Sequence, residues 1–320
     1  MTATLQAPAS LEDLLTVSGE TARALAGADQ SAWNGKVVAS SSAMLGLAHW
    51  DGTLYLDTEA ILDPLRHLYE HAGEDHPVGT LRVYRESLAT LLHEHAHFLG
   101  PSGATQDAAR EGFIQPGSRE LEEGVTESWA QDHLDDYIRH LGIDNVAPGI
   151  NSVRSGGYYP AFVPAVRHLT AELERRNGLP RGQVLQDLNR QTAAGQFPLL
   201  VDLAYNSTRL PGLEPDAGTR PHLESILRTG LTHLDAYELL HPELATTKSR
   251  SAAESLLTHL DQEVHTAEAA LTFQPLRAVV TPSSTHVALA GLTPPTRVGG
   301  APQAVPVQRP AHTAAGLSRC

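Results

Sequence analysis

The segment His93-Glu94-His95-Ala96-His97 limits the fold of this chain more than any other feature, because it reads H-E-x-x-H within a helical pattern. On an α-helix, residues four positions apart lie one turn apart on the same face, so His93 and His97 can reach one metal ion. Glu94 lies beside them, where its carboxylate can accept a proton from a metal-activated water. Gly100-Pro101 is typical of a helix end, so we expect a helix from residue 79 to about residue 99.

A second polar helix is expected from Ser118, a candidate N-cap, to Leu141, which precedes Gly142. It carries two glutamates one turn apart on the same face, Glu123 and Glu127. Zinc in a catalytic site takes three protein ligands and leaves one position open for water. Two histidines and one glutamate meet that count, and we expect Glu123 to be the third ligand, with Glu127 as the competing candidate. Other divalent metals also accept such ligands.

The pattern His93-Glu94-x-x-His97 followed by Glu123-Gly124-x-x-Glu127 resembles the gluzincin group of zinc metallopeptidases, in the zincin superfamily. The resemblance implies that His93, His97 and Glu123 bind zinc, that Glu94 is the general base, and that Glu127 supports a ligand histidine. It also implies an α+β, mostly helical, zincin-like fold with a small N-terminal sheet, an active-site helix and a glutamate helix. The implied activity is hydrolysis of a peptide or protein substrate.

Two positions depart from the usual pattern of that group. Glu127 stands where many members have aspartate, and Glu122 stands where many have asparagine. On a helix, Glu122 points about 100° away from Glu123, so we do not expect it to be a ligand.

Peptide hydrolysis also needs a donor for the developing oxyanion, worth about 3 kcal/mol. Zincins often use tyrosine or histidine for this purpose. Tyr158 and Tyr159, which follow Gly156-Gly157 in an expected loop, are our candidates, with Tyr205 and His222 as further ones. The alternative for the two loop tyrosines is ordinary packing.

The rest of the chain divides into three expected parts: a zincin subdomain at 1–145, a helical subdomain at 146–275 that completes the cleft, and a Pro/Ala/Gly-rich flexible tail at 276–320. In the first part, a helix is expected over 11–28, a strand over 36–39 and a hairpin over 43–57 around Asp51-Gly52. The hairpin could supply an edge strand for an extended peptide. The tail could lie in the cleft and restrain activity.

Composition excludes several classes of protein. The formal charge is 23 − 37 = −14, and no Lys/Arg cluster stands out, so we expect no nucleic-acid partner. No apolar run approaches the ~18 residues of a membrane span, and residues 1–10 lack the features of a secretory signal. The single cysteine, Cys320, permits no intramolecular disulfide. We therefore expect a cytoplasmic protein that does not enter membranes.

Alternatives to the enzyme hypothesis stay open at this point. His93, Glu94 and His97 could lie on a charged helix face without metal. The chain could also be a non-catalytic or regulatory zinc-binding protein with a zincin fold, or a processing protease with one target. His95 falls among leucines of the helix and is expected to be a core histidine rather than a ligand.

Overall fold

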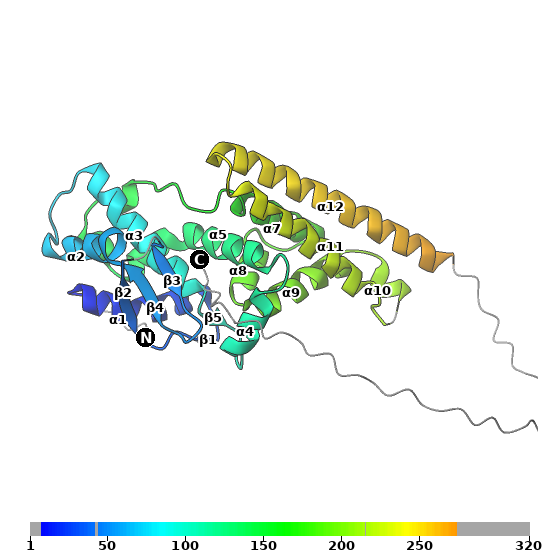
Figure 1. The fold of residues 1–320 in the computed structure, drawn as a ribbon, viewed down its shortest axis with the longest axis horizontal. Coiled ribbons are helices and arrows are strands. Elements are labelled where there is room, and N and C mark those ends of the chain that lie inside the picture. The colour runs from blue at the N-terminus through cyan, green and yellow to red at the C-terminus, as the bar shows by residue number, and fades with distance from the viewer. Residues whose placement is uncertain (1–7, 42–43, 215, 274–320) are drawn as a thin grey trace, which may run out of the picture. The chain divides into compact units, whose positions relative to one another are not determined.

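A computed structural model describes residues 8–41, 44–214 and 216–273 of the chain, and most of these are helical (Figure 1). The α-helices, in chain order, are α1 (Leu11–Ala26), α2 (Asp63–Glu70), α3 (Val78–Ala96), α4 (Gln106–Phe113), α5 (Ser118–His140), α6 (Ile143–Val146), α7 (Val163–Asn177), α8 (Gln183–Asn189), α9 (Ala193–Asn206), α10 (Leu210–Leu213), α11 (Arg220–Thr232) and α12 (Pro242–Thr272). Shorter helical turns are η1 (Thr58–Leu62), η2 (Ile150–Ser152) and η3 (His233–Tyr237).

A small three-stranded sheet lies near the N-terminus, as expected, in the order β2 (Val37–Ser40), β4 (Leu54–Asp57), β3 (Gly46–Ala48). β2 runs parallel to β4, and β3 runs antiparallel to it with Leu47 opposite Tyr55. The predicted hairpin around Asp51-Gly52 is therefore present, with a longer loop than expected. β3 is an edge strand, and it packs beside α3.

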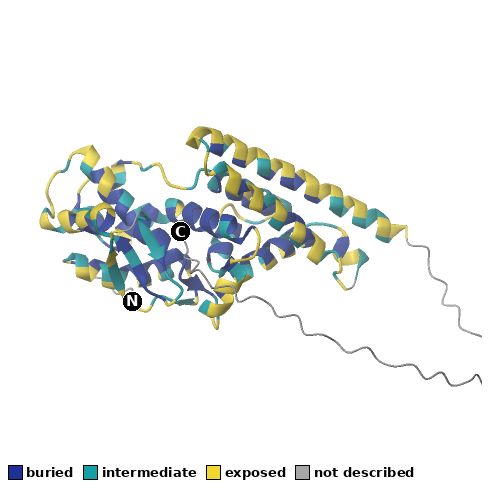
Figure 2. Ribbon diagram, in the orientation of Figure 1, coloured by how far each residue is buried: buried dark blue, intermediate teal, exposed yellow. Residues whose placement is uncertain are grey.

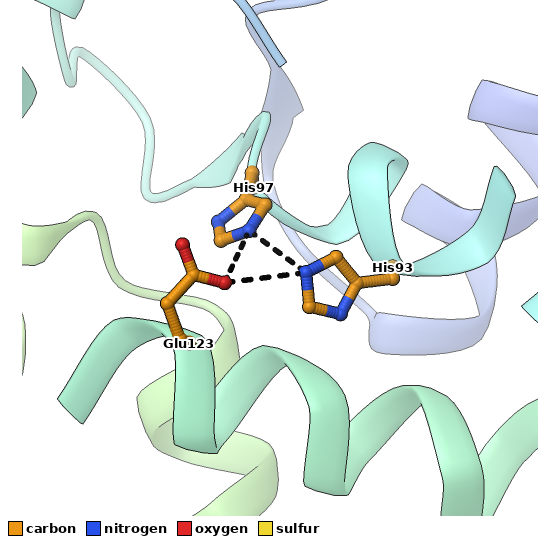
Figure 3. Close-up of side chains that lie close together, drawn as sticks. All are labelled: His93, His97 and Glu123. Atoms are coloured by element: carbon orange, nitrogen blue, oxygen red, sulfur yellow. Dashed lines mark hydrogen bonds and ion pairs between the residues drawn. The ribbon is translucent and has the colours of Figure 1, made fainter. Parts of the chain in front are cut away.

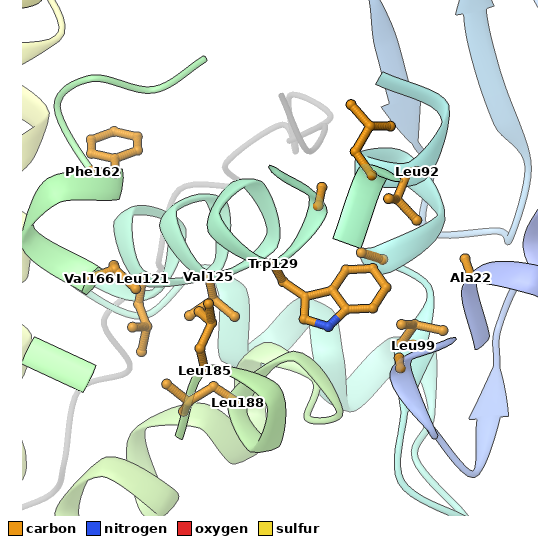
Figure 4. Packing of buried hydrophobic residues seen from close by; sticks show 14 of the residues in the cluster. Ala22, Leu92, Leu99, Leu121, Val125, Trp129, Phe162, Val166, Leu185 and Leu188 are labelled. Atoms are coloured by element: carbon orange, nitrogen blue, oxygen red, sulfur yellow. The ribbon is translucent and has the colours of Figure 1, made fainter. Parts of the chain in front are cut away.

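Helix α5 lies at the centre of the fold, between α1 and α3 on one side and α7, α8, α9 and α11 on the other (Figures 1 and 2). Every residue from 121 to 130 is buried. Apolar side chains of α5 such as Leu121, Val125 and Trp129 pack against neighbours from α3, α7 and α8 (Figure 4). A helix buried on all sides is normally apolar on all sides. The glutamates of α5 break that rule, so their surroundings must compensate them.

The two polar helices are confirmed, but the first ends earlier than expected. α3 stops at Ala96, and His97 is its C-cap. The chain then forms β5 (Leu99–Gly100), which pairs with β1 (Gln30–Ser31), and the N–H of Ala32 donates to the carbonyl of Phe98 at 2.8 Å. Residues up to Leu99, which the sequence pattern placed in the last turn of the helix, are instead part of this long-range strand pairing.

The expected N-cap at Ser118 was wrong, and two other segments have local structure of their own. The segment 101–117 contains α4, whose N-cap Thr105 accepts from the N–H of Ala108. The N-cap of α5 is Gly117, with a φ of 76°, rather than Ser118. Gly195 lies inside α9 and does not end a helix.

The described residues up to Thr272 belong to one compact unit. The expected boundary between 145 and 146 falls inside α6, and the expected tail at 276–320 lies outside the described residues. In the part of the chain that the structure describes, no helix is both long and apolar enough to cross a bilayer.

Gly124 sits where α5 meets α7, and a Cβ there would lie 2.5 Å from Cγ2 of Val166. Val166 is fully buried and stiff, so the neighbour cannot move aside easily. We expect Gly124→Ala to lower the free energy of unfolding by about 1–3 kcal/mol, measured by urea denaturation. Gly79→Ala, at an exposed position of α3 with nothing near its Cβ, is the control and should be neutral or stabilising by up to about 1 kcal/mol. Equal stability of the two variants would contradict the close approach of α5 and α7.

Candidate metal centre

Three ligand atoms from α3 and α5 converge on one point (Figure 3). The Nε2 atoms of His93 and His97 are 3.1 Å apart, and Oε2 of Glu123 lies 3.3 Å from the first and 3.4 Å from the second. All three side chains are buried, and Glu123 is fully enclosed. Among the described residues, this is the one group of His, Cys, Asp or Glu that could hold a metal ion.

The size of this triangle matches zinc. Ligand atoms about 2.0–2.1 Å from a zinc ion and separated by the tetrahedral angle lie about 3.4 Å from each other. Both distances from a histidine Nε2 to the Glu123 oxygen are longer than an ordinary N–H···O hydrogen bond, which measures about 2.7–3.2 Å. Neither oxygen of Glu123 has a hydrogen-bond partner among the described residues. A buried carboxylate held only by two long ion pairs is incompletely compensated, and a shared cation would satisfy it.

The other nitrogen of each histidine faces a carboxylate. Nδ1 of His93 lies 2.9 Å from Oε2 of Glu127, and Nδ1 of His97 lies 3.0 Å from Oε1 of Glu122. An ionised carboxylate only accepts, so each Nδ1 carries a hydrogen, and Nε2 is the atom that a metal ion would bind after displacing the second proton of the ring. Both rings are thus oriented as metal ligands.

Sequence reasoning found Glu127 in this role and missed Glu122. The rotation of about 100° that removes Glu122 from the ligand position turns it toward the far side of the His97 ring. One signal for Glu122 was that each ligand histidine needs an acceptor for its Nδ1–H, and a carboxylate is a common choice.

The electrostatics of the cluster are dominated by burial and by the opposite charges within it. Burial alone would lower the pKa of His93 and His97, but the carboxylates around them outweigh it. The pKa of His93 is held well above its ordinary value, and that of His97 is raised to about 9. Burial would raise the pKa of Glu123, yet the two histidines lower it. Glu123 is therefore ionised, as a metal ligand must be.

Glu94 lies beside the ligands and is held by the edge strand. Its Oε2 accepts the backbone N–H of Ala48 at 2.8 Å. A Cβ on Gly46 would lie 2.6 Å from Oε1 of Glu94, so the strand can approach the carboxylate this closely because residue 46 has no side chain. Burial raises the pKa of Glu94, although His93 and His97 act against the shift.

The two loop tyrosines lie in different surroundings. The ring of Tyr159 stacks on His93, with 5.7 Å between centroids and 13° between planes. Burial and the nearby carboxylates of Glu123 and Glu94 raise the pKa of Tyr159, so its hydroxyl stays protonated. Tyr158 is 41% exposed, and its backbone N–H donates to Oε1 of Glu127 at 2.8 Å. The structure thus brings Tyr159 to the metal centre and leaves Tyr158 at its rim.

A cavity of about 270 Å³ opens beside Glu94 and His93. Its walls come from the segment leading into β3, from α3 and from the tyrosine loop, and its lining residues are Met44, Leu45, Gly46, Thr90, His93, Glu94, Tyr158 and Tyr159. A small chemical group that occupies this cavity would contact both His93 and Glu94.

His95 is a core histidine, as expected. It is 1% exposed, its Nε2 lies 2.7 Å from Oγ of Ser18, and its ring meets Trp33 edge-on. Burial lowers the pKa of His95 to about 3, so the ring is neutral.

The further oxyanion candidates lie elsewhere in the fold. The hydroxyl of Tyr205 donates to the carbonyl of Glu214, and His222 pairs with Glu263 at 3.0 Å. Neither lines the cavity at the metal centre.

Comparison with protein-family models, with curated proteins and with solved structures found no match to this chain.

Each carboxylate beside a ligand histidine should affect metal affinity. We expect Glu122→Gln and Glu127→Gln each to weaken zinc binding about 10–100-fold, because the amide orients the ring less firmly. Loss of a ligand, in His97→Ala or Glu123→Ala, should remove stoichiometric zinc. The measurement is elemental analysis after dialysis against a mild chelator, followed by competition with a chromophoric chelator.

Glu120→Gln is the matched control, because Glu120 is a buried glutamate of the same helix whose charged neighbours are Arg119, Asp235 and Glu238. It should bind zinc as the unaltered protein does. Zinc affinity unchanged in Glu122→Gln, or no stoichiometric metal in the unaltered protein, would contradict the site.

Proposed function

We propose that this protein is a zinc-dependent peptidase with a zincin-like fold, in which His93, His97 and Glu123 hold the metal and Glu94 is the general base. The observation that carries the proposal is the position of Glu94. This carboxylate lies beside a closed triangle of three metal ligands and on the wall of a cavity. A purely structural zinc site is normally closed by a fourth protein ligand and has no use for such a group.

When bound, zinc supplies Lewis acidity and makes water acidic enough to be deprotonated near neutral pH. Glu94 has the geometry to take that proton, because the N–H of Ala48 fixes one carboxylate oxygen. Burial raises the pKa of Glu94, with His93 and His97 acting against the shift. In the proposed reaction Glu94 holds the proton and passes it onward to a leaving amine.

The edge strand supports a peptide as the substrate. Leu45 and His49 direct hydrogen-bonding groups toward β4, so the alternating residues Gly46 and Ala48 direct theirs away from it. The N–H of Ala48 is already bonded to Glu94, so a peptide would pair with the groups of Gly46 and with the carbonyl of Ala48. An extended peptide that pairs with this edge would lie along the cavity that contains Glu94. The small cavity then accepts one side chain of that peptide.

Tyr159 is the residue best placed to donate to the oxyanion. Its ring stacks on a ligand histidine, and burial beside carboxylates keeps its hydroxyl protonated. A protonated donor in a buried site stabilises negative charge more strongly than it would in water. Tyr158, which is more exposed, would contribute through its backbone contact with Glu127.

Glu94→Gln should retain zinc and lose hydrolysis by about 10²-fold or more, because the amide cannot accept the proton. A library of fluorescence-quenched peptides, with zinc content measured in the same samples, tests this. Glu254→Gln, at an exposed position of α12, is the control and should be as active as the unaltered protein. Full zinc with cleavage that does not depend on Glu94, or with no cleavage of any peptide, would favour the non-catalytic zinc-binding alternative.

Tyr159→Phe should lower kcat by about 10²–10³-fold and leave KM and zinc content nearly unchanged, because one oxyanion donor is lost. Tyr158→Phe keeps the backbone contact and serves as the comparison, with a smaller loss. Steady-state kinetics on the best library peptide measure both. An equal loss in the two variants would count against Tyr159 as the donor.

A further inference from the structure

Tyr159 is part of a stack of planar groups that extends away from the metal centre. Its ring lies 5.7 Å from that of His93 and 5.7 Å from that of Phe162, with interplanar angles of 13° and 16°. The guanidinium of Arg119 lies over the Phe162 ring, 5.3 Å from its centroid. Four groups from three segments therefore form a series of contacts that starts at one proposed metal ligand.

The outer end of the stack is fixed by charge. Arg119 forms two hydrogen bonds with Glu238, at 2.8 and 3.0 Å, and one with Asp235 at 3.1 Å. A bidentate pair fixes both the position and the plane of the guanidinium. Arg119 thus cannot slide off the Phe162 ring without breaking these bonds.

The backbone alone does not fix Tyr159. It follows Gly156-Gly157, the most permissive residues of the loop, and it adopts a φ of 56°. A positive φ costs a non-glycine residue about 1 kcal/mol or more and persists only where surrounding contacts enforce it. Its carbonyl accepts from the N–H groups of Phe162 and Val163 at 2.9 and 3.0 Å, which anchors the main chain and leaves the ring to the stack.

We propose that Phe162 and Arg119 are positioning residues that hold the Tyr159 ring against His93, so that its hydroxyl is placed for the oxyanion before substrate arrives. The inference rests on the proposed function for its catalytic consequence. A misplacement of about 1 Å in such a group can cost about 10²-fold in rate, so support for the ring matters as much as its presence. Phe162 is fully buried and lies outside the cavity lining, so it would not touch a substrate there, and its contact on the side of the cavity is with Tyr159.

The test is a double-mutant cycle on the full chain loaded with zinc. Phe162→Leu should lower kcat about tenfold, with KM and zinc content unchanged, and should have no further effect in the Tyr159→Phe background. Phe197→Leu is the matched control, because Phe197 is equally buried and carries Arg228 over its ring at 3.9 Å, on α9. It should leave kcat unaltered. Equal losses from Phe162→Leu in both backgrounds would overturn the proposal.

Amide hydrogen exchange over residues 155–163 provides a readout that does not depend on hydrolysis. Exchange should be about tenfold faster in Phe162→Leu and faster in Arg119→Gln, and unchanged in Phe197→Leu. If Phe162→Leu does not fold, the same exchange measurement on Arg119→Gln still tests the positioning role. Faster exchange together with no hydrolysis by the unaltered protein would support the positioning role and overturn only the proposed function. Unchanged exchange in both variants would overturn the positioning role itself.

Discussion

Burial of carboxylates in the middle of the protein is the constraint on which the rest of the structure depends. Glu94, Glu122, Glu123 and Glu127 all lie in the interior, where each isolated charge costs several kcal/mol. Two histidines compensate part of this charge through their Nδ1 atoms, which leaves two Nε2 atoms and one Glu123 oxygen turned toward each other. A divalent cation could balance such a cluster. Relief of the cost of charge in the core would therefore contribute to the affinity for metal.

The surrounding fold keeps this cluster in place through contacts between distant segments. Gly124 lets α7 approach α5 closely, and the β1–β5 pairing fixes the chain directly after His97. Glu127 has three partners, since it meets the His93 ring and accepts from Gln131 and from the backbone of Tyr158. One carboxylate thus joins a metal ligand to the loop that carries Tyr159.

Much of the site was predictable because its geometry is local. The spacing of His93 and His97, and of Glu123 and Glu127, follows from the helical repeat, and the structure places these side chains together. Glu122 was missed because its role depends on which side of the His97 ring faces α5. The early end of α3 was missed because β5 pairs with a strand some seventy residues earlier (Leu99 with Ser31), and local propensity carries no information about that partner. The two tyrosines could not be separated because loop conformation decides which one faces the metal centre.

The contact between Glu94 and Ala48 has a consequence for where a peptide substrate would be cleaved. The carboxylate of Glu94, which is the general base in the proposed function, is bonded to the backbone of the strand edge. A peptide that pairs with β3 can shift only in whole residues, about 3.4 Å at a time, and each single shift exchanges the faces of its side chains. The register of the peptide on β3 would then decide which of its peptide bonds lies beside Glu94. Cleavage would fall at a fixed step from a recognised side chain, and a peptide with an inserted residue would be cut one step away or not at all.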